Sequence, residues 1–184
     1  LNTGTIGVNN NVRAIATMGT DLYVGGNFTT AGGITVNYIA KYTPSTRTWS
    51  ALNTGTVGVD NVVYALAVLD TDLYVGGAFV SAGGITVNRI AKYTPSTSTW
   101  SALNDGAIGV NSDVYVITVM GTDLYVGGPF TTANNVTVNY IAKYTPSTQT
   151  WAALNTGSSV GLNSYPYLNS IVVMGTDLYI GGSF

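Results

Sequence analysis

The sequence predicts an all-β protein made of small four-stranded antiparallel sheets in tandem. The first observation is an internal repeat, because a segment that starts at Leu1 recurs with few changes at Leu52, Leu103 and Leu154. The second is that short β-branched apolar runs alternate with turn signals roughly every 8–12 residues. The third is that no window of the sequence shows helical periodicity. A repeated β unit is therefore the expected building block.

The repeat unit is 51 residues long. Trp49, Trp100 and Trp151 recur at this spacing. A fixed period in this range is typical of solenoids and propellers. We expect one repeat array over 1–184, divided into units 1–51, 52–102 and 103–153 and a partial unit 154–184.

Each unit is expected to contain four strands. Residues 12–18 are nearly all apolar and rich in β-branched side chains, so this first strand should lie innermost and be covered on both faces. The second strand is expected at 21–28 and the third at about 36–43. Residues 48–52 alternate large apolar with small side chains, which is typical of a half-exposed outer strand.

Glycine and proline mark the connections between these strands. A tight Gly19-Thr20 turn joins the first strand to the second, and a turn built on Pro44 joins the third to the fourth. The Gly25-Gly26 pair at the end of the second strand permits a β-bulge or a close approach of another backbone segment.

The strand pattern favours a β-propeller. A single sheet of this size cannot bury its apolar faces alone, so each unit needs neighbours on both sides. An apolar first strand and an amphipathic last strand fit a blade that points outward from a central axis. The chain supplies about 3.6 blades, and we expect closure to come from further sequence of a longer chain or from another copy.

Two motifs carry a family resemblance. The run Asp-Leu-Tyr-Val-Gly-Gly starts at Asp21, and the run Tyr-Thr-Pro-Ser-Thr-x-Thr-Trp starts at Tyr42. Both resemble the kelch repeat, and the units look closer still to the kelch-like repeats of secreted bacterial proteins and of fungal cell-polarity cortical markers. The resemblance implies a β-propeller. Thr43 stands where kelch repeats usually have Asp, which leaves the kelch subfamily open.

Composition excludes several classes of partner. Charged residues make up 8% of the chain, the formal net charge is −2, and the six basic residues are scattered. No basic stripe could follow a phosphate backbone, so no nucleic acid partner is expected. No apolar stretch approaches the ~20 residues of a spanning helix, so no membrane insertion is expected.

Catalytic chemistry is not expected. The sequence contains no His and no Cys, which removes the commonest general bases, nucleophiles and transition-metal ligands, including those of galactose oxidase, a kelch-like enzyme. Asp21 and its counterparts follow a hairpin turn, where Asp commonly bonds nearby backbone amides. The repeated Trp and Tyr residues are expected in the core. We therefore predict no catalytic residue, no cofactor and no metal site.

Differences between the units gather in two sets of loops, those that lead into the first strand and those between the second and third strands. In an antiparallel meander both sets emerge at the same end, so one face of the array varies and the other stays constant. Loops on a rigid scaffold commonly carry recognition, and Tyr and Arg dominate binding hot spots. The sequence predicts a partner-binding face with Arg13, Tyr64, Arg89, Tyr115 and Tyr140. Drift on a tolerant surface is the alternative.

Two functions follow. The first is a non-enzymatic structural or assembly protein that self-associates to complete its propeller or a filament. The second is a lectin-like or adhesive module that binds a glycan or protein through the variable loops. The Thr- and Asn-rich, Glu-free composition favours an extracellular or cell-surface location, with a virion surface as a further possibility.

Overall fold

The computed structural model describes residues 7–52, 58–103, 109–156, 159–162 and 167–183. Within these ranges every regular element is a β-strand, as the sequence predicts. Three sheets of four antiparallel strands and a fourth sheet of two strands follow one another along the chain. Among the residues of these ranges, no helix is long and apolar enough to cross a membrane.

The first sheet shows the pattern of a unit. Its strands are β1 (Val12–Met18), β2 (Asp21–Gly26), β5 (Ile39–Thr43) and β6 (Thr48–Ala51), in the spatial order β1-β2-β5-β6. The predicted first, second and fourth strands are thereby confirmed to within a few residues. The third strand starts later than expected, because Asn37 and Tyr38 adopt positive φ angles of 44° and 68°, which extended strands do not allow.

The other sheets repeat this order. The second sheet contains β7 (Val63–Leu69), β8 (Asp72–Gly77), β11 (Ile90–Thr94) and β12 (Thr99–Ser101), and the third contains β13 (Val116–Met120), β14 (Asp123–Gly127), β17 (Ile141–Thr145) and β18 (Thr150–Ala153). The fourth contains β21 (Tyr167–Met174) and β22 (Asp177–Ser183), and a separate pair is formed by β19 (Asn155–Thr156) and β20 (Ser159–Val160).

A small hairpin follows the second strand of each full unit, where the sequence suggested only a loop. These hairpins are β3 (Thr30–Ala31) with β4 (Ile34–Thr35), β9 (Ser81–Ala82) with β10 (Ile85–Thr86), and β15 (Thr132–Ala133) with β16 (Val136–Thr137). Each turn has two residues with positive φ, and in the first hairpin these are Gly32 and Gly33 at 57° and 86°. Such turns match the twist of a two-stranded ribbon.

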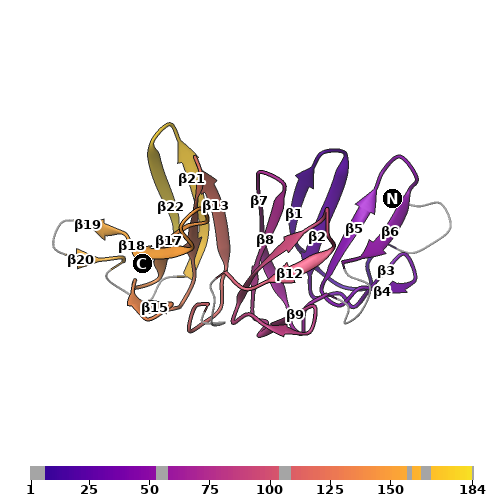
Figure 1. The fold of residues 1–184 in the computed structure, drawn as a ribbon, viewed down its shortest axis with the longest axis horizontal. Coiled ribbons are helices and arrows are strands. Elements are labelled where there is room, and N and C mark those ends of the chain that lie inside the picture. The colour runs from indigo at the N-terminus through magenta and orange to yellow at the C-terminus, as the bar shows by residue number, and fades with distance from the viewer. Residues whose placement is uncertain (1–6, 53–57, 104–108, 157–158, 163–166, 184) are drawn as a thin grey trace.

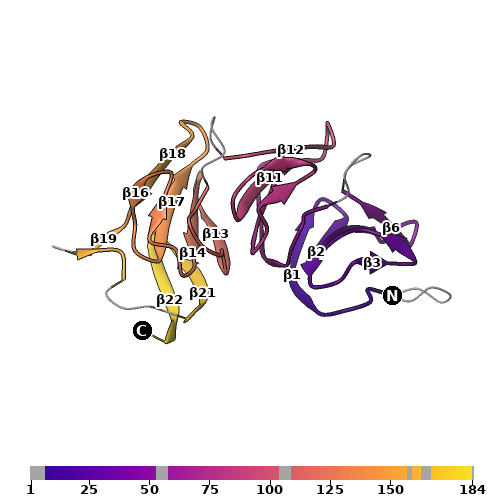
Figure 2. The same ribbon diagram turned by 90° about the horizontal axis from the view of Figure 1, so that it is seen from below.

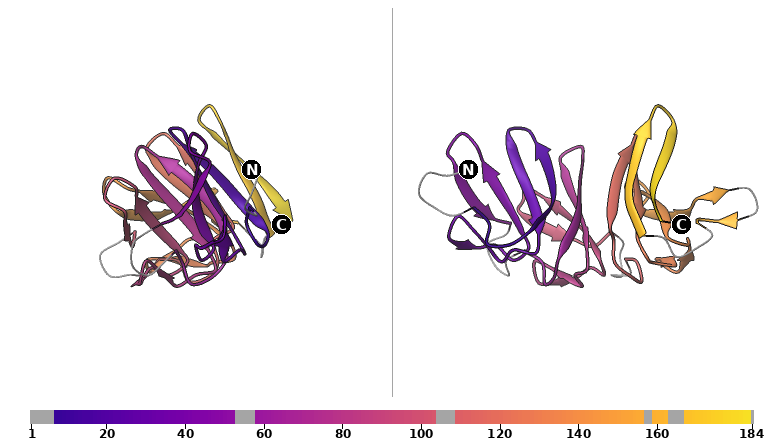
Figure 3. Two further views of the ribbon diagram at one scale, coloured as in Figure 1. Left: turned by 90° about the vertical axis from the view of Figure 1, so that its right-hand side faces the viewer. Right: turned by 180° about the vertical axis from the view of Figure 1, so that it is seen from behind.

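The sheets stand side by side in an arc (Figure 2). The first strands of successive sheets are neighbours, since β1 contacts β7, β7 contacts β13 and β13 contacts β21. Figures 1 and 3 show the β1–β2 and β21–β22 turns at one end of the array, and Figure 1 shows the small hairpins at the other end. We call these ends the turn face and the loop face.

Side chains of one sheet insert over a glycine of the preceding sheet. A Cβ placed on Gly25 would lie 2.4 Å from Val63 Cγ1, and one on Gly76 would lie 2.4 Å from Val114 Cγ1. The same contact recurs at the third seam, where a Cβ on Gly127 would lie 3.0 Å from Leu168 Cδ1. Only glycine leaves room for this packing.

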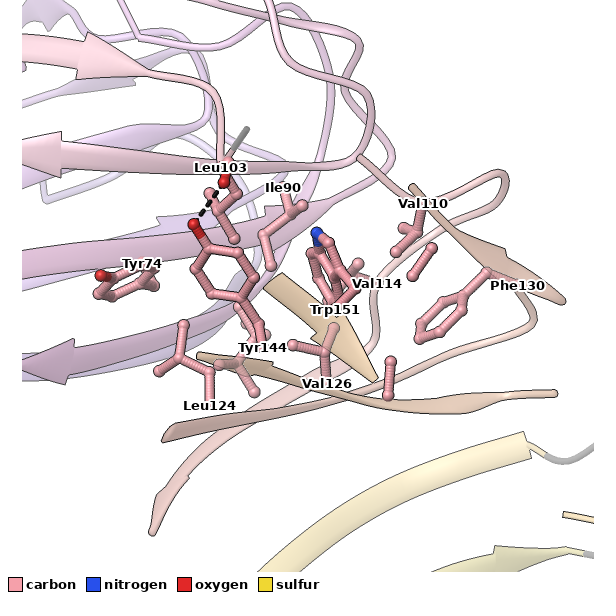
Figure 4. Close-up of a cluster of buried hydrophobic side chains, with 14 of the residues drawn as sticks. Tyr74, Ile90, Leu103, Val110, Val114, Leu124, Val126, Phe130, Tyr144 and Trp151 are labelled. Atoms are coloured by element: carbon pink, nitrogen blue, oxygen red, sulfur yellow. Dashed lines mark hydrogen bonds between the residues drawn. The ribbon is translucent and has the colours of Figure 1, made fainter. Parts of the chain in front are cut away.

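Aromatic residues fill the rest of each seam, as the sequence predicts. The Tyr–Trp pair of the third and fourth strands recurs, with ring centroids 5.0 Å apart for Tyr93 and Trp100 and 4.9 Å apart for Tyr144 and Trp151. The Tyr144 hydroxyl donates to the carbonyl of Leu103, which follows β12, the last strand of the second sheet (Figure 4). Trp100 Nε1 donates to the equivalent Leu52 carbonyl at 3.4 Å. The aromatic pairs of the second and third sheets therefore each tie their sheet to the previous one.

The expectation that every first strand is covered on both faces is wrong for β1. Ile15 is 61% exposed, whereas its counterpart Ile117 is 7% exposed. Val12 is 43% exposed, whereas Val63 is fully buried. The difference in exposure follows from the position of each strand in the array. β7 and β13 each lie between two sheets, whereas β1 has a described sheet on one side.

Candidate functional site

Four equivalent positions open onto the loop face at the start of the first strands. In the first sheet, Val12 pairs with Gly26 and Ala14 with Gly25, so Arg13 is the extra residue of a β-bulge. Tyr64 and Asn169 are the extra residues of the same bulge in β7 and β21. Tyr115 stands directly before β13 and its amide donates to the Gly127 carbonyl at 2.9 Å. A bulge re-aims the side chain of its extra residue, so the fold presents these four side chains in the same way.

The second glycine of each pair makes room for the backbone at this point. A Cβ on Gly26 would lie 2.1 Å from the Asn11 carbonyl oxygen, and one on Gly77 would lie 2.1 Å from that of Val62. The sequence allowed a bulge or a close backbone approach at the double glycine, and both occur, with the bulge in the first strand opposite the pair. The bulge also fixes the position of its extra residue in the first strand. That position follows from the strand register, which the sequence alone does not give.

Three of the predicted binding residues come together in a cleft. The Arg13 guanidinium carbon lies 6.0 Å from the centroid of the Tyr64 ring. Tyr64 and Tyr115 meet edge to face, with centroids 5.4 Å apart and an interplanar angle of 80°. Tyr167 and Asn169 join them around a shallow cleft of about 360 Å³. The cleft therefore joins side chains from all four sheets.

Arg13 is oriented by a neutral partner. Its Nε donates to Asn27 Oδ1 at 3.1 Å, which links the first strand to the loop after the second strand. The Tyr64 ring face is its second neighbour. In the described part of the chain no carboxylate lies within ion-pair distance of Arg13. The cleft thus carries a positive charge that these residues leave unneutralised.

Arg89 and Tyr140 do not line this cleft. Both occupy the residue before the third strand with positive φ angles of 71° and 75°. Arg89 donates to the Ala78 carbonyl and lies 3.4 Å from the Asp113 carboxylate of the next unit. Tyr140 packs against the hydrophobic cluster that contains Leu168 and Ile171. These two side chains connect neighbouring units on the loop face.

One set of loop residues was missed by the sequence analysis. Asn9 Oδ1 accepts hydrogen bonds from the amides of Thr29 and Thr30 at 2.9 and 3.0 Å. Asp60 and Asn111 make the same pair of bonds in the next two units. These contacts hold the two loop sets together, so their expected location at one end is confirmed. The recurrence of Asn or Asp at one repeat position was the available signal.

The repeated Asp after the first turn has a structural role, but through different partners from those expected. Asp72 Oδ2 lies 3.0 Å from Lys92 Nζ, and its Oδ1 accepts from Thr94 Oγ1 at 2.6 Å. The same contacts recur around Asp123. Asp therefore ties the second strand to the third through side chains rather than through turn amides. Among the residues the structure describes, no group of three potential ligands lies close enough to hold a metal ion.

Clefts also occur between the sheets at the turn face. The larger, of about 570 Å³, is lined by residues that include Tyr74, Lys92 and Tyr144, and the smaller, of about 240 Å³, by the equivalent Tyr23, Lys41 and Tyr93. Burial raises the pKa of Tyr23 to about 12, and nearby Tyr93 and Asp21 add to the effect. Burial likewise raises the pKa of Tyr144 to about 12. These phenols belong to the seams and stay protonated at neutral pH.

Residues 57–184 match the family model described as the Rax2 C-terminal beta propeller domain. The chain belongs to this Rax2 β-propeller family. Residues 22–45 also match a β-propeller domain family of unknown function, DUF5122. The repeated four-stranded sheets are thus propeller blades. The family likeness to fungal polarity proteins is confirmed, whereas membership of the kelch family itself is not.

A curated relative agrees with this family. The polarized growth protein rax2 of Schizosaccharomyces pombe is 31% identical over 114 residues, which cover 53% of this chain. The matched part is 9% of that relative, so the chain spans about a tenth of its length.

Solved structures show the same fold. The extracellular domain of a putative one-component system from B. thetaiotaomicron superimposes with a TM-score of 0.60 at 19% identity, over 94% of this chain and 20% of that one. The computationally designed Ika8 protein superimposes with a TM-score of 0.58 at 13% identity, over 93% of this chain and 42% of that one. At these identities the likeness concerns the fold alone.

Proposed function

We propose that the chain is a non-enzymatic β-propeller scaffold that associates through the two blade faces left uncovered among the described residues. The next blade comes from a second copy of the chain or from further repeats of a longer chain, and the isolated chain docks on its own copies. The supporting observation is the glycine seam at Gly25, Gly76 and Gly127. Each described seam uses the same pair of surfaces, so one blade presents inserting side chains and its neighbour presents the glycine. Such unlike surfaces generate head-to-tail contacts between copies.

The first blade carries the inserting surface in an uncovered form. Val12 and Ile15 are 43% and 61% exposed and occupy the positions that Val63 and Leu66 fill against Gly25. Covering the exposed half of each of these two side chains stabilises a contact by about 1 kcal/mol each. This surface therefore favours a glycine-bearing blade as its partner.

The fourth blade carries the receiving surface. Gly181 occupies the place of Gly25, and the described atom closest to a Cβ placed there is Ser170 Oγ at 2.8 Å. Tyr179 is 50% exposed, whereas its counterparts Tyr23 and Tyr74 are 3% exposed within the seams. Val172 and Met174 are also exposed on this blade, at 57% and 62%. This exposed apolar surface of the fourth blade is therefore a suitable partner for the exposed apolar side chains of the first blade.

Light scattering tests the proposal. The chain should show a mass above its monomer value of 19.1 kDa that rises with concentration. Ile15→Asp should shift it to the monomer, because a charge cannot be buried unpaired in the seam. Ile34→Asp is the matched control, since Ile34 is 41% exposed on the small hairpin of the same blade and should leave the mass unchanged. A monomer at every concentration would contradict the proposal.

A second candidate function is adhesion through the loop face. The cleft that joins Arg13, Tyr64, Tyr115 and Tyr167 favours it, since exposed Tyr and Arg residues in a concave site are typical of recognition. We place both functions at the cell surface. The Thr- and Asn-rich, Glu-free composition supports this location, and the B. thetaiotaomicron neighbour is an extracellular domain.

A further inference from the structure

We infer that the cleft between Arg13, Tyr64, Tyr115 and Tyr167 binds an acidic saccharide, with the sugar carboxylate on the Arg13 guanidinium and the sugar rings against the tyrosines. The inference rests on the second candidate function and is independent of the assembly proposal. It starts from the side chains that the four bulge-related positions bring together.

The charge of the cleft selects an anion. The described lysines form ion pairs with aspartates at 3.0–3.4 Å, and Arg89 lies 3.4 Å from Asp113. Arg13 has an amide oxygen and an aromatic face as partners instead. Its Nε is engaged with Asn27, which fixes the plane of the guanidinium while the terminal nitrogens remain as donors. A carboxylate matches that fork in geometry and in charge.

Other charged groups near the cleft are already engaged. Asp60 accepts two backbone amides, from Val80 and Ser81. Asp113 faces Arg89. The charge of Asp113 is therefore offset by Arg89, whereas Asp60 stays negative, and Arg13 is the cationic side chain among the residues that line the cleft.

The remaining lining favours a sugar over a peptide side chain. Tyr167 is 65% exposed, and Tyr64 and Tyr115 are half-buried, so phenol rings form much of the accessible wall. The aliphatic lining residue Leu168 is 1% exposed and offers no pocket for a peptide anchor. Phenol faces accept the weakly positive C–H faces of a sugar ring, and phenol hydroxyls together with the Asn169 amide can bond its hydroxyls.

Calorimetric titration with an oligogalacturonate tests the inference. The acid should bind, its carboxyl-reduced neutral counterpart should bind at least about tenfold more weakly, and added salt should weaken the acid selectively. Arg13→Gln should lower the affinity for the acid by at least about tenfold, and Tyr167→Ala should lower the affinity for both sugars. Arg47→Gln removes the same charge from a turn at the opposite face and should have no effect.

The outcomes separate this inference from the assembly proposal. Arg13 is exposed, so Arg13→Gln should retain both the thermal transition and the mass of the parent chain. Equal binding of the acidic and neutral sugars, unchanged binding by Arg13→Gln, or no binding of either sugar would overturn the inference. Tighter Arg13-dependent binding of a hexaglutamate peptide than of the sugar acid would also overturn it, in favour of a protein partner.

Discussion

Val63 of the second blade packs directly over Gly25 of the first, at a position where a Cβ on the glycine would lie 2.4 Å from Val63 Cγ1. The contact explains the double glycine motif from both sides. The first glycine receives the neighbouring blade, and the second, Gly26, accommodates the bulged backbone of its own blade. One dipeptide thus determines how the blades stack and where Arg13, Tyr64 and Asn169 point.

Substitution of Gly76 tests the seam. Gly76→Ala should lower the free energy of unfolding by about 2 kcal/mol, because its Cβ would lie 2.4 Å from Val114 Cγ1 and the packed seam must shift. Gly7→Ala is the control, since no heavy atom lies within 4 Å of its Cβ position. Urea denaturation should find the control unchanged or slightly stabilised. Equal stability of the two variants would show that the seam is loosely packed.

Thr94 should contribute more to stability than Lys92, although both contact Asp72. Thr94→Val removes a short hydrogen bond at a partly buried site and should cost about 1 kcal/mol. Lys92→Met removes an ion pair whose side chains are 34% and 23% exposed, and should cost less than about 0.5 kcal/mol. Denaturation at low and high salt checks both values. A larger, salt-sensitive loss for Lys92→Met would contradict this ranking.

Asp60 should be replaceable by Asn but not by Ala. Asn9 and Asn111 make the same two amide contacts in the neighbouring units, so Asp60→Asn should change stability by less than about 0.5 kcal/mol. Asp60→Ala leaves the Val80 and Ser81 amides without this acceptor and should cost about 1–2 kcal/mol. Amide hydrogen exchange should then speed up at these two residues. Similar exchange in both variants would exclude the loop-clamping role.

Stability should fall in alkaline solution. Burial raises the pKa of Tyr23 and of Tyr144 from 10.0 to about 12, so between these pH values the unfolded chain loses protons that the folded chain retains. The free energy of unfolding should therefore be insensitive to these groups below pH 10 and decrease as pH rises toward 12, by roughly 2–3 kcal/mol for each group.

Tyr23→Phe isolates one of these groups. The variant should lose less stability than the parent chain across the same pH range. Subtracting the phenolate absorbance of the folded variant from that of the folded parent chain leaves the signal of Tyr23. This signal should titrate near pH 12. Titration of that difference near pH 10 would mean that the phenol is solvated and the seam open.

The strands could be predicted from the sequence because their signals are local. The apolar run at 12–18, the Gly19-Thr20 turn and the double glycine each act within a few residues. The small hairpins escaped notice because their strands have two residues each, too short for any alternation to show. The Gly32-Gly33 turn was the one local sign of them.

The candidate site was only partly predictable for a different reason. Variation among the units marks five residues equally, namely Arg13, Tyr64, Tyr115, Arg89 and Tyr140. A sequence difference does not show which way a side chain points. The bulges aim Arg13 and Tyr64 into the cleft, and the positive φ of Arg89 and Tyr140 turns those two side chains toward neighbouring units. Tyr167 lies in one of the varied loops but was not among the predicted binding residues, because its place in the cleft depends on the position of the fourth blade.

Engineered disulfides test head-to-tail docking through the glycine seam most directly, since the natural chain has no cysteine. An internal pair, Gly25→Cys with Val63→Cys, should close within one chain, because the two Cβ positions lie 3.0 Å apart and a small adjustment reaches disulfide geometry. The matching pair across copies, Val12→Cys with Gly181→Cys, should give covalent oligomers under mild oxidation, and each single variant should give far less. A Val12→Cys/Gly181→Cys chain that stays monomeric while the internal pair closes would contradict the account.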